Sequence, residues 1–467
     1  MLTSVRRTLG DREMMRAIFT LAWPTVLEQA LSTLVQYADT AQVGVLGAQA
    51  SAAIGLTTTV MWLLYGPMGA AGMSVLSCIS MSLGARDEER ARKAASQGVI
   101  LALSVGGVLM VLTLAISPFL PRWLGGSEEI LKDASIYFAI VCAPMVFRSM
   151  GIIFGASLRA AGDTKTPMLI NLTMNAVNIV LNFLFISGPR TVTVGSASLP
   201  IWGAGWGVAG AAIASAVSYV LGGVLMARAA WREPKLGLRG QKIRLCPEIM
   251  SQCLRVGTPI AGERLIASLG HVAFSSIIAR LGTIPMAAHT IALTAEEAFY
   301  IPGYGMQAAA ATLAGYSAGE RSEQKLMQYT STILFLTTAL MVTLGALLFL
   351  FPQAVMSIFT PDAQVIALGS RVLRIVAISE PFFGILVILE GVFNSVGDTK
   401  APLLFSLISI WGVRVASTFV CVNVFHLGLE AVWYCMVADN MVRFALMTAR
   451  YVRGGWKRRL DLAPQEK

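Results

Sequence analysis

The stretch Gly162-Asp163-Thr164-Lys165-Thr166-Pro167 returns as Gly397-Asp398-Thr399-Lys400-Ala401-Pro402, 235 residues further along the chain. The same offset places residues 24–90 on residues 259–325 without a gap, with fifteen identities in 67 positions. Composition inflates matches between apolar segments, but chance seldom keeps one register across a second, polar motif. The chain is therefore a direct repeat of two halves, and parallel repeats of this size are typical of transporters.

The composition is that of an integral membrane protein. Hydrophobic residues make up 55% of the 467 residues and charged residues only 13%, about half the charged share of a soluble domain. So many apolar side chains cannot all be buried in a water-soluble protein. This composition excludes a cytosolic enzyme, a disordered chain and a nucleic-acid-binding module, although the net charge is +10.

Twelve stretches are apolar and long enough to span a bilayer, which takes about 20 residues per helix. They are residues 17–43, 50–82, 95–119, 133–159, 167–188, 206–230, 252–280, 286–317, 328–351, 364–394, 401–424 and 428–450. Prolines inside the longer stretches predict kinks; they are Pro24, Pro67, Pro259, Pro302 and Pro381.

Six spans in each repeat give the two halves the same orientation in the membrane. We therefore expect an all-α integral membrane protein with twelve transmembrane helices, built as two parallel-repeat six-helix lobes around a central cleft. The N-terminal lobe is residues 1–232, and the C-terminal lobe, with a short basic tail, is residues 233–467.

The distribution of Lys and Arg predicts the orientation. These residues gather in the N-terminus, in the loops after even-numbered spans and in the C-terminal tail, and they are few in the opposite loops. Because basic segments stay in the cytoplasm, we expect both termini to be cytoplasmic, in a plasma membrane that is the inner membrane of a bacterium. The net positive charge then reflects the orientation in the membrane, and the basic segments would also have some affinity for anionic lipid.

Several motifs resemble those of the multidrug and toxic compound extrusion (MATE) transporters. They are Ala38-Asp39-Thr40 with Val43-Gly44, residues 158–165, Ala287-Ala288-His289, Ile301-Pro302-Gly303 and Ala318-Gly319. The resemblance covers essentially the whole chain. It implies a non-enzymatic, cation-coupled antiporter, in which an amphipathic and often cationic compound leaves the cytosol while H⁺ or Na⁺ enters as the coupling ion.

The repeat also shows where the two halves differ in polar residues inside the spans. Asp39, Asn178 and Asn182 have no charged or amide counterpart 235 residues later, and Asn175 lies on the same helical face as the other amides. A lone carboxylate beside amides serves either as a proton carrier or as the one negative charge of a Na⁺ site. The family's cation site matches Asp39, Asn178 and Asn182, although some members have a second carboxylate where Asn182 stands. We therefore expect a cation site here, the alternative being that Asp39 merely caps buried backbone groups.

The second lobe carries its own charges inside spans, which we expect to form a structural network. Asp439 and Arg443 are four residues apart on one helix, the spacing of an intrahelical salt bridge. Arg414 needs a carboxylate, because an unpaired guanidinium in a bilayer costs several kcal/mol, but the sequence does not identify it. Glu263 has Glu28 as its repeat mate, which indicates a shared structural role.

Glu296, on the eighth span, is the anion that we expect in the substrate cleft, where it would attract cationic compounds. Methionine and aromatic residues on the second and eighth spans would line the same cleft, since methionine repacks easily around varied ligands; they are Met61, Tyr65, Phe299 and Tyr300. At helical spacing, ordinary packing explains such residues equally well.

Other functions are less well supported. Residues 315–319 match the G-x-S-x-G of hydrolases, but they end an apolar helix instead of forming a strand-to-helix elbow. Three histidines without an HExxH motif give no support for a zinc site. The main alternative is a flippase of lipid-linked oligosaccharide from the same superfamily, because arginines suited to holding a pyrophosphate lie in or near spans: Arg148, Arg264, Arg414 and Arg443. A receptor or scaffold would not need a buried Asp39. We expect a monomer whose partners are small amphipathic molecules and membrane lipids, and no nucleic acid.

Overall fold

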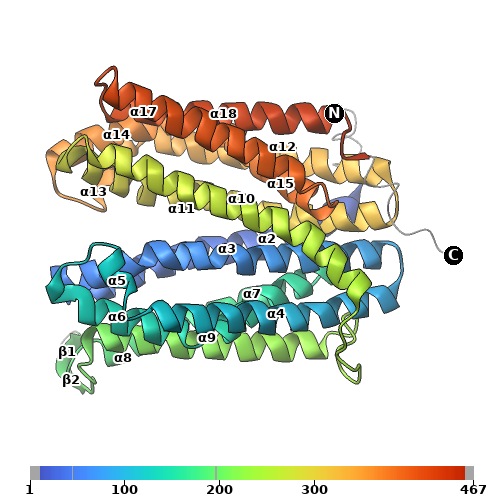
Figure 1. Cartoon of the computed structure of the whole chain (residues 1–467), viewed down its shortest axis with the longest axis horizontal. Helices are drawn as coiled ribbons and strands as arrows, with labels where there is room; N and C mark the ends of the chain where they lie inside the picture. The colour runs from blue at the N-terminus through green and yellow to red at the C-terminus, as the bar shows by residue number, and fades with distance from the viewer. Residues whose placement is uncertain (1–10, 45, 195–196, 458–467) are drawn as a thin grey trace. The chain divides into compact units, whose positions relative to one another are not determined.

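A computed structural model describes residues 11–44, 46–194 and 197–457, and most of these residues are helical. The helices of the first repeat are α2 (Arg12–Gly44), α3 (Ala48–Gly84), α4 (Glu88–Ile116), α5 (Leu120–Trp123), α6 (Glu128–Cys142), α7 (Met145–Ala160), α8 (Lys165–Phe185) and α9 (Gly207–Arg232). Those of the second are α10 (Pro247–Ala279), α11 (Thr283–Gly319), α12 (Glu323–Leu350), α13 (Pro352–Ser357), α14 (Ala363–Ala377), α15 (Glu380–Ser395), α16 (Lys400–Ser406), the π-helix η1 (Leu407–Val415), α17 (Ala416–Asn423) and α18 (Leu429–Val452). Figure 1 follows them along the chain from blue to red.

Most of the long helices have the length and composition of membrane spans. Within the described ranges, seven helices are long and apolar enough to cross a membrane, and two bent pairs would raise the number to nine. Each of the twelve predicted stretches falls on a helix, on a bent pair or, for residues 401–424, on the continuous run from α16 to α17. The helical membrane-protein fold is confirmed, and the count of twelve crossings stays a prediction.

Two of the predicted stretches are bent pairs of helices. The pair α6 and α7 bends by 48°, and the pair α14 and α15 by 55°. Pro144 precedes α7 and Pro381 lies in the first turn of α15, where a missing N–H and a fixed φ interrupt helical hydrogen bonding. The bend at Pro381 was predicted, whereas the one at Pro144 was not. The other four prolines lie inside uninterrupted helices.

The repeat is visible in the helix ends. Adding 235 to the bounds of α2, α3, α6 and α7 gives the bounds of α10, α11, α14 and α15 to the residue. Backbone conformation repeats as well, since Arg86 and Arg321 both adopt a positive φ, of 60° and 53°. The shared register ends after α8, where β1 (Arg190–Val194) and β2 (Ala197–Ile201) form an antiparallel hairpin. Residues 424–428, between α17 and α18, contain no such hairpin.

The chain folds into two compact units. The first-repeat unit consists of Leu31–Val75 and Arg92–Met250, and the second-repeat unit holds the rest, including Leu76–Ala91. The first half of α2 and the last turns of α3 thus belong to the unit formed mainly by the second repeat. The predicted boundary of the lobes, at residues 232 and 233, describes the repeat and stays a prediction.

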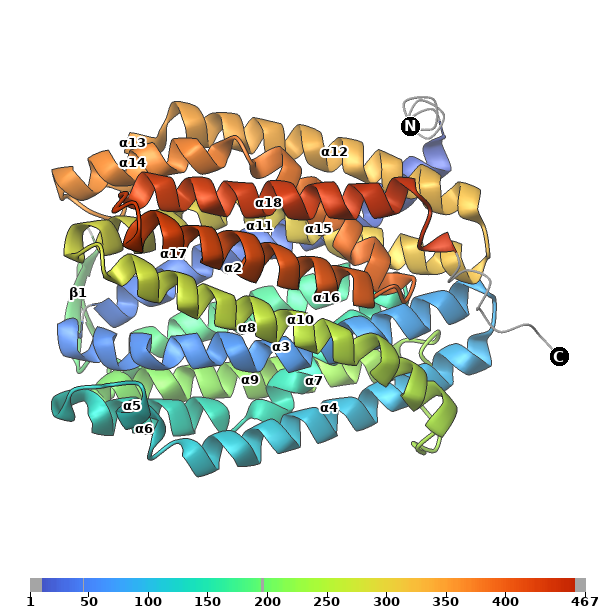
Figure 2. The same ribbon diagram turned by 45° about the horizontal axis from the view of Figure 1, so that its top comes forward.

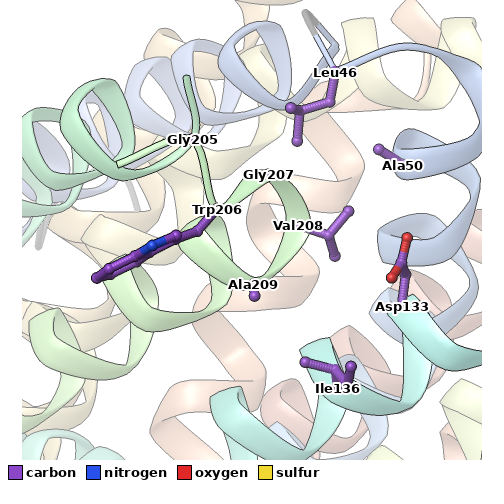
Figure 3. Close-up of a pocket in the computed structure, with 9 residues that line it drawn as sticks. All are labelled: Leu46, Ala50, Asp133, Ile136, Gly205, Trp206, Gly207, Val208 and Ala209. Carbon is purple, nitrogen blue, oxygen red and sulfur yellow. The ribbon is translucent and has the colours of Figure 1, made fainter. Parts of the chain in front are cut away.

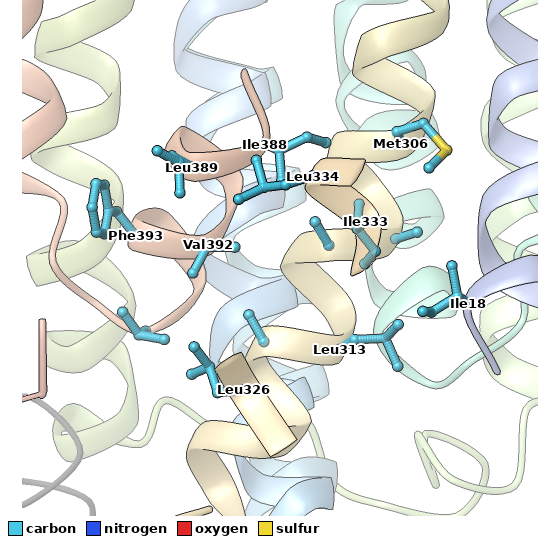
Figure 4. Packing of buried hydrophobic residues seen from close by; sticks show 14 of the residues in the cluster. Ile18, Met306, Leu313, Leu326, Ile333, Leu334, Ile388, Leu389, Val392 and Phe393 are labelled. Carbon is cyan, nitrogen blue, oxygen red and sulfur yellow. The ribbon is translucent and has the colours of Figure 1, made fainter. Parts of the chain in front are cut away.

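Each unit has its own apolar core. In the second-repeat unit, buried side chains of α11, α12 and α15 pack together with Ile18 of α2 (Figure 4); among them are Leu313, Ile333, Leu389 and Phe393. In the first-repeat unit, α9 packs along both α7 and α8 (Figure 2), and a smaller apolar cluster surrounds Met68 and Phe138. These packed helices hold the polar residues of each unit in fixed positions.

Two glycines related by the repeat allow α3 and α11 to cross closely within the second-repeat unit. A Cβ atom on Gly84 would overlap the carbonyl of Tyr316, and one on Gly319 would overlap the carbonyl of Met81. Met81 and Tyr316 are themselves 235 residues apart, so the two repeats contribute equivalent positions to the crossing. Only glycine fits where one backbone lies against another.

Polar and sulfur contacts join the same segments. The Thr25 hydroxyl of α2 donates to the Gly305 carbonyl of α11 at 2.8 Å. The buried thiols of Cys78 on α3 and Cys253 on α10 lie 3.3 Å apart. Helices from both repeats are therefore held together inside this unit.

Candidate functional site

The first-repeat unit brings together the carboxylate and two of the amides that the sequence singles out. Asp39 lies in the last two turns of α2 and is half-buried, and Asn182 lies in the last turn of α8 and is fully buried. Apolar sequence makes both segments helical, so each polar side chain is presented from a rigid backbone. Asn178 lies one turn before Asn182, on the same face of α8.

Hydrogen bonds link these residues into a chain across three helices. The Asn182 amide donates from Nδ2 to Asp39 Oδ1 and also to Asn178 Oδ1, the latter at 3.3 Å. The Asn178 amide in turn donates to the Ser215 hydroxyl of α9 at 3.4 Å. We call Asp39, Asn178, Asn182 and Ser215 the Asp39 cluster.

Two amide oxygens on the helices that carry Asp39 and Asn182 are buried and unpaired within the described part of the chain. They are Oδ1 of Asn182 and Oε1 of Gln42, which accept no hydrogen bond from any residue that the structure describes. Gln42 lies three residues after Asp39, and its Nε2 donates to the Ile179 carbonyl of α8 at 3.3 Å. A buried acceptor without a donor costs about 1–3 kcal/mol, and hard cations take oxygen ligands of this kind. The geometry therefore suits a small cation better than an apolar molecule.

One predicted member of the site lies apart. Asn175 is half-buried on α8, one turn before Asn178 and further from Asp39 along the helix, and it makes none of the hydrogen bonds around the carboxylate. Sequence reasoning missed Gln42 and Ser215. The spacing of Gln42 from Asp39 was a usable signal, whereas nothing in the sequence marks Ser215 among the small residues of α9.

The repeat-related position in the second unit has a different chemistry. Phe274, the repeat mate of Asp39, lies with its ring 5.6 Å from the guanidinium carbon of Arg414. Ser417, the mate of Asn182, donates its hydroxyl to the Val413 carbonyl of its own helix at 2.5 Å. A fixed guanidinium at this position disfavours a bound cation. The asymmetry expected from the sequence is thus present in side-chain geometry.

Buried charges of the second unit pair differently from the sequence-based prediction. Arg414 of η1 forms an ion pair with Asp439 of α18 at 2.6 Å, with side chains only 6% and 0% exposed. The predicted intrahelical bridge from Asp439 to Arg443 is not among the ion pairs of the described residues, because Asp439 faces η1. Instead, Arg443 donates to the Ser406 hydroxyl at 3.4 Å, and that hydroxyl donates to Glu263 at 2.7 Å.

The residues predicted for a substrate cleft lie in both units. In the first, Met61 and Tyr65 are one turn apart on α3, and Tyr65 is 43% exposed. The Met61 sulfur lies 3.7 Å from a guanidinium nitrogen of Arg148 on α7.

In the second unit, Glu296 of α11 is buried, and its Oε2 has no hydrogen-bond partner in the described part of the chain. Phe299 packs at the edge of an apolar cluster, and Tyr300 lies 5.4 Å from the ring of Phe383. A role for these residues in substrate binding stays a prediction.

A pocket of about 300 Å³ opens elsewhere in the first-repeat unit (Figure 3). Leu46, Asp133, Ile136 and the backbone around Trp206 line it. None of the predicted site residues does. Its size is at the lower limit of small-molecule sites.

Comparison with known proteins places the two repeats in one family. The model of the MatE family matches residues 24–184 and 259–420, which are the two halves found by the 235-residue offset. The chain belongs to the MatE family. Transport across a membrane is thus its class of activity, and the resemblance inferred from the motifs is confirmed.

Relatives of this MatE-family chain match it over nearly its full length. A Thermotoga maritima protein described as "Probable multidrug resistance protein NorM" is 29% identical over 96% of this chain and 95% of its own. "Uncharacterized transporter YisQ" of Bacillus subtilis is 25% identical over 94% of both.

Solved structures of membrane transporters share the fold. A structure titled "Outward-facing conformation of a multidrug resistance MATE family transporter of the MOP superfamily" has a TM-score of 0.83 and 25% identity, covering 95% of this chain and 96% of its own. A MOP-superfamily transporter from Pyrococcus furiosus has a TM-score of 0.85 over 97% of both chains. At 24% identity, this second likeness supports the fold alone.

Proposed function

We propose that this chain is a cation-coupled antiporter that exports amphipathic, mainly cationic drugs or toxic metabolites by alternating access between its two lobes. Asp39 carries the coupling ion, either H⁺ or Na⁺. The observation that supports this most directly is the Asp39 cluster, in which the carboxylate accepts from Asn182, whose own buried oxygen has no donor among the described residues.

Ion binding changes what the Asp39 cluster can do. In the charged state, Asp39 accepts a hydrogen bond from the Asn182 amide. It depends on that bond, because a carboxylate in an apolar span is costly without one. A bound proton or Na⁺ neutralises the carboxylate. A proton converts one carboxyl oxygen into a donor, whereas Na⁺ would draw on the free oxygens of Asn182 and Gln42. Either event alters how α2 packs against α8, and so it can bias the transporter between two conformations.

The test is efflux of a cationic dye from vesicles reconstituted with the purified protein, with a pH gradient or a Na⁺ gradient imposed in turn. We expect one gradient to drive efflux, and Asp39→Asn to abolish it while the protein elutes and melts normally. Asp133→Asn is the matched control, since this exposed carboxylate lies outside the Asp39 cluster. Full coupling in Asp39→Asn would remove Asp39 from the mechanism, and no efflux under either gradient would refute the antiporter.

We further infer that the chain works as a monomer in a bacterial inner membrane, with both termini in the cytoplasm and Glu296 as an anion for cationic substrates. The basic loops and tail support the orientation. Glu296→Gln should weaken export of a cationic dye more than export of a neutral one. An equal loss for both dyes would make Glu296 structural.

A flippase is less well supported, because most of the span arginines that would be needed to hold a pyrophosphate have partners. Arg414 pairs with Asp439 and Arg264 with Glu390, at 3.4 Å, while Arg443 donates to Ser406. Transport of lipid-linked oligosaccharide by the reconstituted protein, in the absence of dye efflux, would reverse this preference.

A further inference from the structure

Arg148 is a cation in the interior of a membrane span. It lies in the first turn of α7, directly after the 48° bend that divides the fourth predicted span into two halves. The bend is near the middle of residues 128–160, so Arg148 lies close to mid-depth in the span. The side chain is half-buried. A guanidinium at this depth costs several kcal/mol unless it is compensated or functional.

The described neighbours of Arg148 are an aromatic ring and a thioether, neither of which carries a charge. Its guanidinium carbon lies 4.9 Å from the centre of the Tyr219 ring of α9, and Nη1 lies 3.7 Å from the Met61 sulfur. An aromatic face and a thioether hold a guanidinium by weak interactions. Among the residues that the structure describes, no carboxylate lies within 4 Å of it.

The other arginines inside spans have carboxylate or hydroxyl partners in this fold. Arg414 has Asp439 at 2.6 Å, and Arg264 has Glu390 at 3.4 Å. Arg443 donates to Ser406, which also donates to Glu263. All three lie in the second repeat. At the repeat mate of Arg148 the chain has Phe383, and at the mate of Met61 it has Glu296. Arg148 is therefore specific to the first repeat, like Asp39.

We propose that Arg148 binds an anionic group, a carboxylate, of the transported amphipath. This inference rests on the proposed export function and identifies a residue that would distinguish amphipaths carrying a carboxylate from simple cations. The planar guanidinium offers paired N–H donors to a carboxylate. Met61 and Tyr219 already hold the guanidinium in place, which lowers the conformational entropy lost on binding. Tyr65 lies one turn from Met61 and is 43% exposed, so it offers an aromatic surface to the apolar part of the ligand.

Rhodamine B and its methyl ester test this assignment. They share one cationic ring system, but only rhodamine B has a free carboxylate. Equilibrium binding to the purified protein in detergent, followed by fluorescence anisotropy, needs no ion gradient. We expect wild-type protein to bind rhodamine B more tightly than the ester. Arg148→Gln should weaken rhodamine B binding about 10- to 100-fold, as expected for a lost charged hydrogen bond, and leave the ester unchanged.

Two further variants keep the result interpretable. Arg122→Gln removes an exposed arginine that is 73% accessible and paired with Glu128, and it should change neither affinity. Arg148→Lys keeps the charge without the fork, and it should retain part of the preference for rhodamine B even if Arg148→Gln folds poorly.

The inference is overturned if wild-type protein binds neither dye or binds both equally, or if Arg148→Gln weakens both dyes alike. Failure of the antiporter proposal has a different signature. In that case the dyes would still bind with the difference described, but no imposed gradient would drive their efflux.

Discussion

A carboxylate inside an apolar helix persists when nearby polar atoms share its charge, and Asp39 meets that condition through a single amide. Asn182 is the pivotal residue, because its Nδ2 contacts both Asp39 and Asn178 while its Oδ1 stays unpaired. The same side chain can therefore stabilise the empty carboxylate and act as a ligand once an ion binds. Coupling between ion binding and transport should therefore be very sensitive to substitution of this one residue.

Replacing Asn182 should distinguish residues that bind the coupling ion from residues that only lie on the same helix. Asn182→Ala removes both an amide donor and a free oxygen, and we expect the apparent affinity for the coupling ion to fall about 10-fold or more. Asn175→Ala is the matched control on the same helix, and it should leave affinity within about twofold, because Asn175 makes no bond to Asp39. Ion-dependent efflux rates measured over a range of ion concentrations give both values. Equal effects would return Asn175 to the site.

The ion pair of Arg414 and Asp439 predicts a stability effect at a single buried contact. Asp439→Asn leaves a guanidinium uncompensated, and breaking one partner of a buried pair costs about 3–5 kcal/mol. We expect a large fall in melting temperature in detergent. The double variant Arg414→Met, Asp439→Leu should recover much of it, because no unpaired charge remains. A double variant that melts as low as Asp439→Asn would contradict this account.

At the scale of elements, the crossing of α3 and α11 depends on two glycines that the repeat relates. Gly84 and Gly319 are the last residues of α3 and α11, so the crossing joins the ends of the two helices. The crossing lies in one compact unit together with the Thr25 hydrogen bond to Gly305. Helix packing, not local sequence, holds these segments together.

Gly319→Val tests that crossing. Its side chain would overlap the Met81 carbonyl, so α3 and α11 would have to shift, and we expect the melting temperature to fall by several degrees. Gly151→Ala is a control inside a helix with open space around it, where a methyl group should be neutral or slightly stabilising. A Gly319→Val protein as stable as wild type would mean that the helices do not cross so closely.

Most helix positions could be predicted from the sequence, since the apolar stretches and the 235-residue offset both mark them. The break at Pro144 escaped prediction although Pro144 lies inside the predicted span 133–159 and carries the same proline signal as Pro381. The π-helix η1 escaped because nine residues of wider helical turns leave no periodic signal in a largely apolar stretch. The partner of Arg414 escaped for a related reason, as spacing within α18 favoured Arg443, and only the tertiary fold places Asp439 against η1. Asp39, Asn178 and Asn182 were found because the repeat exposes differences between halves.

For the whole molecule, alternating access requires segments of the two repeats to part at some stage of the cycle. Cys78 of α3 and Cys253 of α10 lie 3.3 Å apart and belong to different repeats. A disulfide between them would hold those helices in the arrangement described. The thiols therefore report on whether this contact opens during transport.

Oxidation with copper phenanthroline should form that disulfide, with two electrons passing to Cu(II) and two protons to solvent. We expect dye efflux to fall to background and to recover with dithiothreitol. Cys253→Ser should be insensitive to the oxidant, and mass spectrometry should confirm the link. Full efflux by cross-linked protein would show that α3 and α10 stay together through the cycle.

The matching helix ends of the two repeats indicate where the chain has and has not changed length since the duplication. From α2 to α7, and from α10 to α15, the long helices have kept common boundaries, so neither copy has accepted a net insertion or deletion that displaced them. The β1–β2 hairpin is the place where the copies diverge in length. An epitope or a fluorescent reporter inserted in that hairpin would thus use a point at which the architecture has already tolerated added chain.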